Sequence, residues 1–265
     1  MDADRSGRVQ SVERAVKLLN ALGRSAGGFR LTDLAREAGL SLTTVHRLLT
    51  TLEQSQFVQF SPQSNLWHVG AGAFAVGSAY SRNRNFVASA IPFLRRLRDQ
   101  TRETVNLGIA EDDEIILVSQ VPSREIDRSI APIGGRTPMT ASGMGKAVLS
   151  SYTPSDIEAL IRRKGLRKAT PKTLTSPAAL RAEISTGSIN GYFTDDEEYR
   201  SGIRCVAAPV FDNRGEVICA ISVSGITSRI PAERVVSLGY SVQQAAAQIS
   251  GFFHGRALAS GAHPA

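Results

Sequence analysis

Ser142 and Lys146 are the residue types of a serine nucleophile and its base, and Gly145-Lys146 matches the end of a phosphate-binding loop. The SxxxK spacing differs, however, from the SxxK spacing of penicillin-binding enzymes. The phosphate loop also needs a glycine at position 140 and a hydroxyl at position 147, where the chain has Thr140 and Ala147. We therefore expect no catalytic residues and a protein that is not an enzyme.

Metal-ligating residue types occur without the spacing of a metal site. The acidic run at residues 195–198 resembles one, but consecutive side chains point in different directions, so we expect a solvated turn there. Cys205 and Cys219 form no CxxC motif, and so few cysteines indicate free thiols in a reducing compartment. The four histidines are scattered along the chain. The sequence predicts no metal and no cofactor.

A second group of polar side chains is typical of DNA recognition. In a helix-turn-helix the second helix enters the major groove, so hydrogen-bonding groups must gather on its exposed face near its N-terminal end. The candidate DNA-binding residues are Ser41, Thr43, Thr44, His46 and Arg47. Hydroxyls and the Arg47 guanidinium can donate to phosphates or base edges. A helical hairpin with a solvated polar face is the alternative interpretation.

The elements around these residues favour a winged helix-turn-helix at residues 1–70. Apolar residues recur at helical spacing in three segments, each with a candidate N-cap. These helices are expected at residues 9–22, 33–38 and 42–54, with caps at Ser11, Thr32 and Ser41. Two alternating segments, residues 56–60 and 65–69, then predict a β-hairpin that forms the wing. The combination of helix-turn-helix and wing is more specific than either part alone.

The rest of the chain predicts a separate α+β domain with an antiparallel sheet. A linker helix is expected at residues 71–85, an effector-binding domain at 86–256 and a flexible tail at 257–265. Pro92 should lie near the first turn or a kink of its helix. Strands are expected at residues 105–110, 115–121, 206–211 and 217–224, and helices at 143–150, 155–163, 177–189 and 233–253.

Two features of this second domain could bind a small anion. The segment Ser142-Gly143-Met144-Gly145-Lys146 opens a helix with little side-chain bulk, so its backbone N–H groups could meet a carboxylate. Ser222 and Ser224 project from one face of their strand and Cys219 from the other. A serine pair hydrogen-bonded within the sheet is the alternative.

Several motifs in the same order resemble the isocitrate lyase regulator (IclR) family of transcription regulators. They are SVERAVKLL at residues 11–19, LTDLAREAGL at 31–40, TVHRLLTTL at 44–52, GRTPMTASGMGKA at 135–147, GYFTDDEE at 191–198 and GIRCVAAPVFD at 202–212. The resemblance covers about residues 9–255. Arg102 stands where a glycine is common, and Trp67 replaces a usual tyrosine. The resemblance implies a GAF-like effector domain, a dimer or dimer of dimers (a homotetramer), and a palindromic double-stranded DNA operator.

The same resemblance implies which residues bind the effector. Six positions match the effector site of glyoxylate- and pyruvate-responsive members: Gly143, Met144, Asp195, Cys205, Ser222 and Ser224. A short 2-oxo acid suits such a small polar pocket, while regulation of aromatic-acid catabolism is the alternative. Asp195 would repel a carboxylate unless one group is protonated or Asp195 accepts a bond from a hydrated aldehyde. Ile126 and Ile203 are candidate apolar walls.

Charge and hydropathy agree with a DNA-binding regulator in the cytoplasm. The net charge is +7, and residues 1–84 carry ten Lys and Arg against six Asp and Glu. The positive excess is therefore densest at the N-terminal end, which suits an anionic partner. No apolar run has the length of a membrane span or a secretion signal. A ligand-binding module whose winged helix contacts another protein is the remaining alternative.

Overall fold

The described residues fold into two compact units. The computed structural model describes residues 9–25, 27–83, 85–123 and 131–260. The division between the units falls after position 84, so each unit is described by itself.

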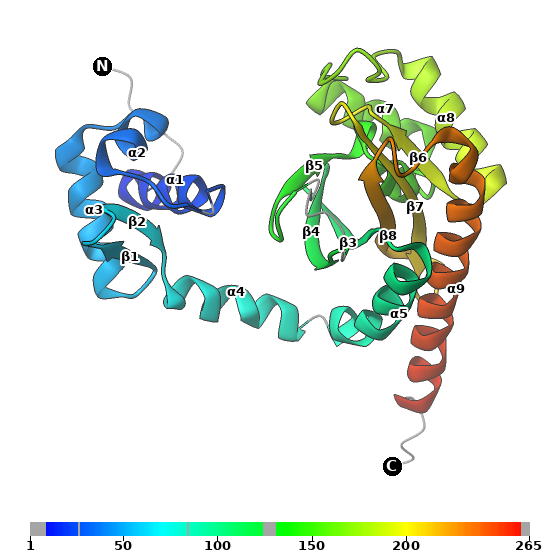
Figure 1. Ribbon diagram of the computed structural model, residues 1–265, viewed down its shortest axis with the longest axis horizontal. Coiled ribbons are helices and arrows are strands. Elements are labelled where there is room, and N and C mark those ends of the chain that lie inside the picture. The colour runs from blue at the N-terminus through cyan, green and yellow to red at the C-terminus, as the bar shows by residue number, and fades with distance from the viewer. Residues whose placement is uncertain (1–8, 26, 84, 124–130, 261–265) are drawn as a thin grey trace. The chain divides into compact units, whose positions relative to one another are not determined.

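The first unit is a three-helix bundle with a two-stranded sheet (Figure 1). Its helices are α1 (Gln10–Gly23), α2 (Leu31–Ala38) and α3 (Leu42–Gln54). Buried residues from all three helices form one core, which includes Leu18, Leu34, Val45 and Leu49. Gly39 adopts a φ of 64° between α2 and α3. This left-handed conformation favours glycine and makes the tight turn of a helix-turn-helix possible.

The predicted wing is present as β1 (Val58–Ser61) and β2 (Leu66–Val69), paired antiparallel. Phe29 adds a short third segment, because its backbone N–H and C=O both bond to Trp67. The cap prediction for Ser41 is confirmed, since its side chain accepts a bond from the Thr44 N–H at 3.3 Å. The cap predictions for Ser11 and Thr32 are wrong, because α1 and α2 each begin one residue before the proposed cap, which places its hydroxyl inside the first turn.

Two further helices lie on either side of the division. Helix α4 (Ala71–Asn83) ends the first unit, and α5 (Asn85–Thr101) begins the second. Pro92 lies inside α5 and not near its first turn, so the helix loses one backbone bond there. In the described part of the chain, every helix is too short or too polar to cross a membrane.

The second unit is built on an antiparallel six-stranded sheet in the order β5-β4-β3-β8-β7-β6. Its strands are β3 (Thr104–Glu111), β4 (Glu114–Val121), β5 (Arg136–Pro138), β6 (Phe193–Asp196), β7 (Ile203–Phe211) and β8 (Val217–Ile226). The sheet curls, so that both edge strands reach the same side of the unit (Figure 1). The prediction of a winged helix-turn-helix followed by an α+β domain with an antiparallel sheet is confirmed.

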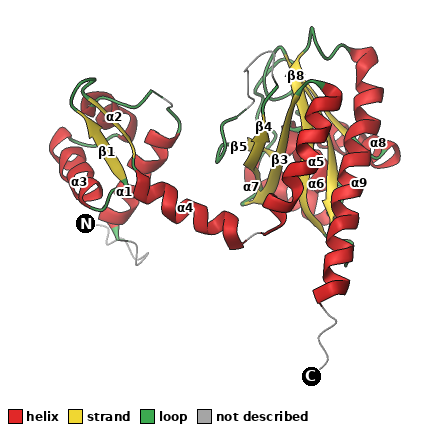
Figure 2. Ribbon diagram, turned by 60° about the horizontal axis from the view of Figure 1, so that its bottom comes forward, coloured by secondary structure: helices red, strands yellow, loops and turns green. Residues whose placement is uncertain are grey.

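Helices cover both faces of this sheet (Figure 2). One face packs on α5 and α9 (Val235–Ser260), and its core consists of aliphatic side chains such as Leu107, Val206 and Ile221. The other face packs on α6 (Gly143–Leu149), α7 (Pro154–Lys164) and α8 (Pro177–Asn190). Short 3₁₀ turns, η1 (Met139–Ala141) and η2 (Ala232–Arg234), precede α6 and α9.

A register shift in β3 and β4 changes which side chains reach the α6 face. Asn106 pairs with Gln120, whereas Gly108 pairs with Leu117, and the shift lies between Leu107 and Gly108. A bulge of this kind places one extra residue in one strand, which breaks the strict alternation of side chains. Both Gln120 and Leu117 therefore face the same layer, although the residues are an odd number apart.

Candidate functional site: an exposed recognition helix and an effector cavity

The predicted DNA-binding residues lie together at the N-terminal end of α3. Ser41, Thr43, His46 and Arg47 are exposed, and Thr44 is half-buried, with its hydroxyl 2.8 Å from that of Ser41. Val45 and Leu49 on the opposite face are completely buried, so the helix is held against the core of its unit. The arrangement leaves a polar surface with hydroxyl, imidazole and guanidinium groups that can reach into a groove of DNA.

One sequence string in this unit matches a hydrolase motif. Residues 23–27 read Gly-Arg-Ser-Ala-Gly, the GxSxG of a nucleophile elbow. That elbow requires a strand before the serine and a helix after it. Ser25 instead follows helix α1, and its hydroxyl donates to the carbonyl of Gly28 at 3.2 Å. The string therefore lacks the structural context of a catalytic serine.

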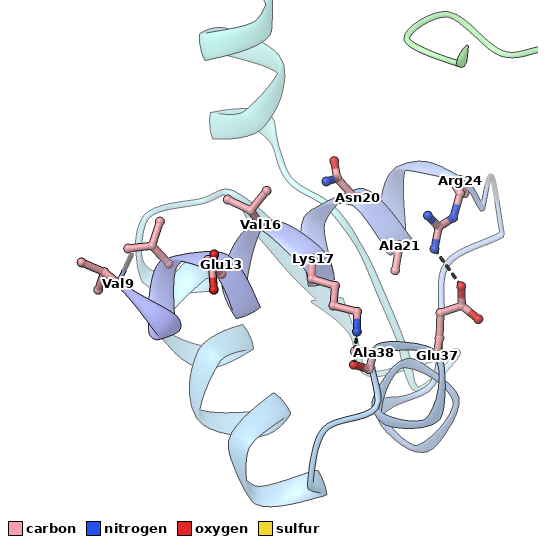
Figure 3. Close-up of a pocket in the computed structure, with 10 residues that line it drawn as sticks. Val9, Glu13, Val16, Lys17, Asn20, Ala21, Arg24, Glu37 and Ala38 are labelled. Atoms are coloured by element: carbon pink, nitrogen blue, oxygen red, sulfur yellow. Dashed lines mark hydrogen bonds and ion pairs between the residues drawn. The ribbon is translucent and has the colours of Figure 1, made fainter. Parts of the chain in front are cut away.

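A shallow groove runs along α1 (Figure 3). Val9, Val12 and Val16 line it and expose 61%, 57% and 48% of their surface. At its other end the Lys17 Nζ donates to the Ala38 carbonyl at 2.6 Å, which fixes α1 against α2. An apolar stripe this exposed on a small DNA-binding unit suits contact with another protein surface.

A small cavity of about 20 Å³ lies between the curled sheet and the start of α6 in the second unit. Each strand contributes to its wall, together with three residues at the N-terminal end of α6. The lining residues are Asn106, Ile115, Leu117, Ala131, Thr137, Ser142, Gly143, Met144, Asp195, Cys205 and Ser222. Polar groups thus come from both halves of the sheet, and the apolar wall consists of Ile115, Leu117, Ala131 and Met144.

Five of the six predicted effector residues line this cavity. Gly143, Met144, Asp195, Cys205 and Ser222 are in its wall, and Ser224 lies behind it, beside Cys205 in the strand register. Ile203 is buried but does not line the cavity, so Ile115 and Leu117 provide the apolar wall that we had assigned to it. The other predicted wall residue, Ile126, lies outside the described residues.

Asn106 is the main polar residue that the sequence interpretation missed. Its Nδ2 donates to Ser224 Oγ at 2.9 Å and to Ser222 Oγ at 3.3 Å, while its Oδ1 accepts from Gln120 at 2.8 Å. Both serine oxygens therefore act as acceptors beneath the cavity, which leaves each hydroxyl proton for another partner. The Ser224 hydroxyl bonds to Cys205, and Ser222 faces the cavity. The sequence held one signal for this role, because Asn106 is the polar residue in the otherwise apolar segment at 105–109.

The start of α6 approaches the sheet closely at Gly143. A Cβ at this position would lie 3.3 Å from the Ala207 Cβ and 3.3 Å from the Phe193 carbonyl oxygen, which is tighter than usual side-chain contacts. Ser142 caps the helix by accepting the Gly145 N–H at 3.1 Å. Glycine at position 143 therefore lets the helix lie directly on β6 and β7, where it forms one end of the cavity.

Asp195 is a buried carboxyl group in the cavity wall, so our prediction of a solvated turn at residues 195–198 is wrong. Asp195 and Asp196 belong to β6, and only 2% of Asp195 and 5% of Glu198 are exposed. Asp195 Oδ1 accepts the Glu198 N–H at 2.7 Å. Burial, with the nearby Glu198 carboxylate, nevertheless raises the pKa of Asp195 to about 7. The Asp195 carboxyl therefore changes between its neutral and its charged form near neutral pH.

A buried ion pair lies behind Asp195. Lys146 of α6 is completely buried, and its Nζ lies 2.5 Å from Glu198 Oε1 and 3.7 Å from Glu183 Oε1 of α8. This pair ties α6 to α8 and to the end of β6, which are the elements that carry Gly143 and Asp195. Across the described residues, no group of three or more His, Cys, Asp or Glu side chains is arranged to hold a metal ion.

Comparisons with known proteins agree with this division of the chain. Residues 11–62 match the family described as the IclR helix-turn-helix domain, and residues 78–251 match the C-terminal domain of the bacterial transcriptional regulator IclR. The chain is 43% identical over 247 residues to the acetate operon repressor of Salmonella typhimurium, covering 92% of this chain and 90% of that protein. It is 42% identical over 250 residues to the transcriptional repressor IclR of Escherichia coli, with coverage of 94% and 91%.

A solved structure supports the fold. An IclR homologue from Microbacterium hydrocarbonoxydans, complexed with 4-hydroxybenzoate, superposes with a TM-score of 0.78. It is 22% identical in sequence, and the match covers 93% of this chain and 100% of that one.

Proposed function

The chain belongs to the IclR family of DNA-binding transcriptional regulators, and from this premise we propose that it is a repressor whose operator binding is controlled by glyoxylate or pyruvate. It is a regulator and not an enzyme, like the curated relatives. The cavity in the second unit, with the Ser222 hydroxyl directed into a polar wall, is the single observation that carries the effector assignment.

The proposed effector contacts follow from the donors that face the cavity. A carboxylate accepts hydrogen bonds from the Ser222 hydroxyl and from the backbone N–H groups of Gly143 and Met144, which have no acceptor within the helix. Below pH 7, a neutral Asp195 beside it removes the repulsion between two carboxylates. The buried Met144 limits the space, which favours a short acid over an aromatic one.

The proposed DNA contacts are the polar residues of α3 together with the β1–β2 wing. A palindromic operator would be read by a homodimer or a dimer of dimers in the cytoplasm, with one α3 in each half-site. The exposed valines of α1 support self-association through the first unit. Phe74 and Val76 of α4 are also exposed, at 77% and 60%, and are further apolar side chains that a second copy could cover.

A mobility-shift assay tests this proposal. The full-length protein is mixed with the upstream region of its own operon at several salt concentrations, with and without glyoxylate, pyruvate or 4-hydroxybenzoate. We expect a specific, salt-sensitive shift that changes with one of the two short acids. No specific shift would favour a winged helix that binds protein, and a response to 4-hydroxybenzoate alone would favour regulation of aromatic-acid catabolism.

Calorimetry with a double variant tests the site itself. Ser222→Ala with Ser224→Ala removes both hydroxyls, so the heat of binding of the effective acid should fall or vanish. Ser237→Ala on the exposed surface of α9 is the matched control. An undiminished signal in the double variant would remove the assignment of these serines to the effector site.

A further inference from the structure

Thr137 carries an unpaired hydroxyl into the effector cavity. Only 5% of Thr137 is exposed, and its Oγ1 has no hydrogen-bond partner in the described structure. A buried polar group without a partner is costly, so a site for a missing partner is expected beside it. The other polar side chains of the wall have partners, since Asn106 and Ser222 bond each other and Asp195 accepts a backbone N–H.

The position of Thr137 separates it from the anion-binding groups. It lies on edge strand β5 and pairs with Ile115 of β4, whereas Ser222 lies on β8 with β4 and β3 in between. Asp195 lies on β6, the other edge strand, which the curl of the sheet brings to the same side of the unit as β5 (Figure 1). Ile115 and Leu117 form the apolar wall next to Thr137. The cavity is therefore polar on two walls, with an apolar stretch between them.

We propose that the Thr137 hydroxyl determines effector specificity by hydrogen-bonding an oxygen atom at the end of the effector that does not carry the carboxylate. This inference rests on the proposed function of the cavity. It assigns the ligand to short acids with two oxygens beyond the carboxylate, such as the geminal diol of hydrated glyoxylate, so that one oxygen binds the opposite wall and the other binds Thr137. Pyruvate carries one ketone oxygen and a methyl group, so when the ketone oxygen binds the opposite wall the methyl group faces Thr137 and leaves its hydroxyl unpaired. A site built for a hydroxyl discriminates strongly against an analogue that lacks it.

Calorimetry on the full chain with glyoxylate and with pyruvate tests the assignment. Thr137→Val keeps the shape of the side chain and removes the hydroxyl, while Thr137→Ser keeps the hydroxyl. We expect the valine variant to bind glyoxylate about tenfold more weakly than the wild type and pyruvate within about twofold of it. The serine variant should keep the preference for glyoxylate. Without ligand, the valine variant should unfold at a higher temperature, because the unpaired hydroxyl is gone.

The outcomes separate this inference from the proposed function. If the wild type binds both acids and Thr137→Val changes neither affinity, or weakens both equally, the specificity role of Thr137 is wrong while the cavity remains the effector site. If the wild type binds neither acid, the proposed effector class is wrong and the role of Thr137 falls with it. Should the valine variant fail to fold, Thr137→Ala provides the same comparison between the two acids.

Discussion

Asn106 and Ser224, 118 positions apart in the chain, are joined by a 2.9 Å hydrogen bond directly behind the candidate effector cavity. The amide donates, so the serine must use its own proton elsewhere. The same amide also holds Ser222. One side chain on β3 thus sets the hydrogen-bond direction of two hydroxyls on β8, and it acts as a positioning residue for the proposed effector.

Asn106→Asp should weaken effector binding at least about tenfold. A carboxylate has the size of the amide but only accepts, so the Ser222 proton would turn toward it and away from the ligand, and the Ser224 proton would turn away from Cys205. Its charge would also repel an acid. Calorimetry with the effective acid measures the loss, and Asn213→Asp in the exposed turn between β7 and β8 is the control. Equal affinities in the two variants would contradict the positioning role of Asn106.

The affinity for the acid should fall as the pH rises above about 7. Because the pKa of Asp195 is raised to about 7, its carboxyl is neutral at lower pH and becomes an anion above that value. The anion would repel the ligand carboxylate, so the affinity can drop by up to about tenfold per pH unit. Titrations between pH 6 and 9 measure the slope. Asp195→Asn should remove it, and an unchanged slope in this variant would assign the effect to another group.

Lys146→Met should destabilise the second unit by about 3–5 kcal/mol, because it leaves the Glu198 carboxylate buried without its partner. Lys172→Met is the matched control, because Lys172 pairs with Asp196 and Glu197 on the surface, where an ion pair contributes little to stability. Urea unfolding measures both. Adding Glu198→Gln to Lys146→Met should restore part of the loss. Similar costs for the two lysine variants would show that the buried pair contributes no more than an exposed one.

Arg47→Met should weaken operator binding by about 1–3 kcal/mol and leave effector binding unchanged. The exposed guanidinium lies on α3, and methionine keeps most of its apolar length. If Arg47 contacts a phosphate, the loss should be similar for all sequences and the salt dependence should decrease; if it contacts a base, specificity should relax at one position. Arg162→Met on the exposed surface of α7 is the control. Operator affinity that is the same in both variants would exclude Arg47 from the interface.

The sequence predicted helices well where the cap and the apolar spacing lie within one short segment. Helix α3 was predicted with the bounds that it has, because the Ser41 cap and the spacing of Val45 and Leu49 are properties of one short segment. Strands β5 and β6 were missed because they have only three and four residues, too few to show a clear alternation of apolar and polar side chains. Asp195 looked like part of an acidic turn for the same reason, since nothing local indicates that α6 packs over β6.

The candidate cavity was predictable only in part. Gly143, Met144, Asp195, Cys205 and Ser222 were named through a family resemblance, and the structure brings them together. Asn106 and Thr137 were missed, because their roles depend on a curled sheet and a register shift that no local pattern contains.

One face of the six-stranded sheet is aliphatic and the other carries the polar side chains of the cavity, and this difference has an evolutionary consequence. Along β8, Ser222 and Ser224 face the cavity layer, whereas Ile221 and Val223 lie in the aliphatic core against α5 and α9. Because neighbouring residues of a strand alternate between faces, substitutions at every second position can change ligand preference while the packing that keeps the sheet folded stays intact. A single scaffold can thereby acquire sensitivity to new metabolites through a handful of exchanges, without first passing through an unstable ancestor.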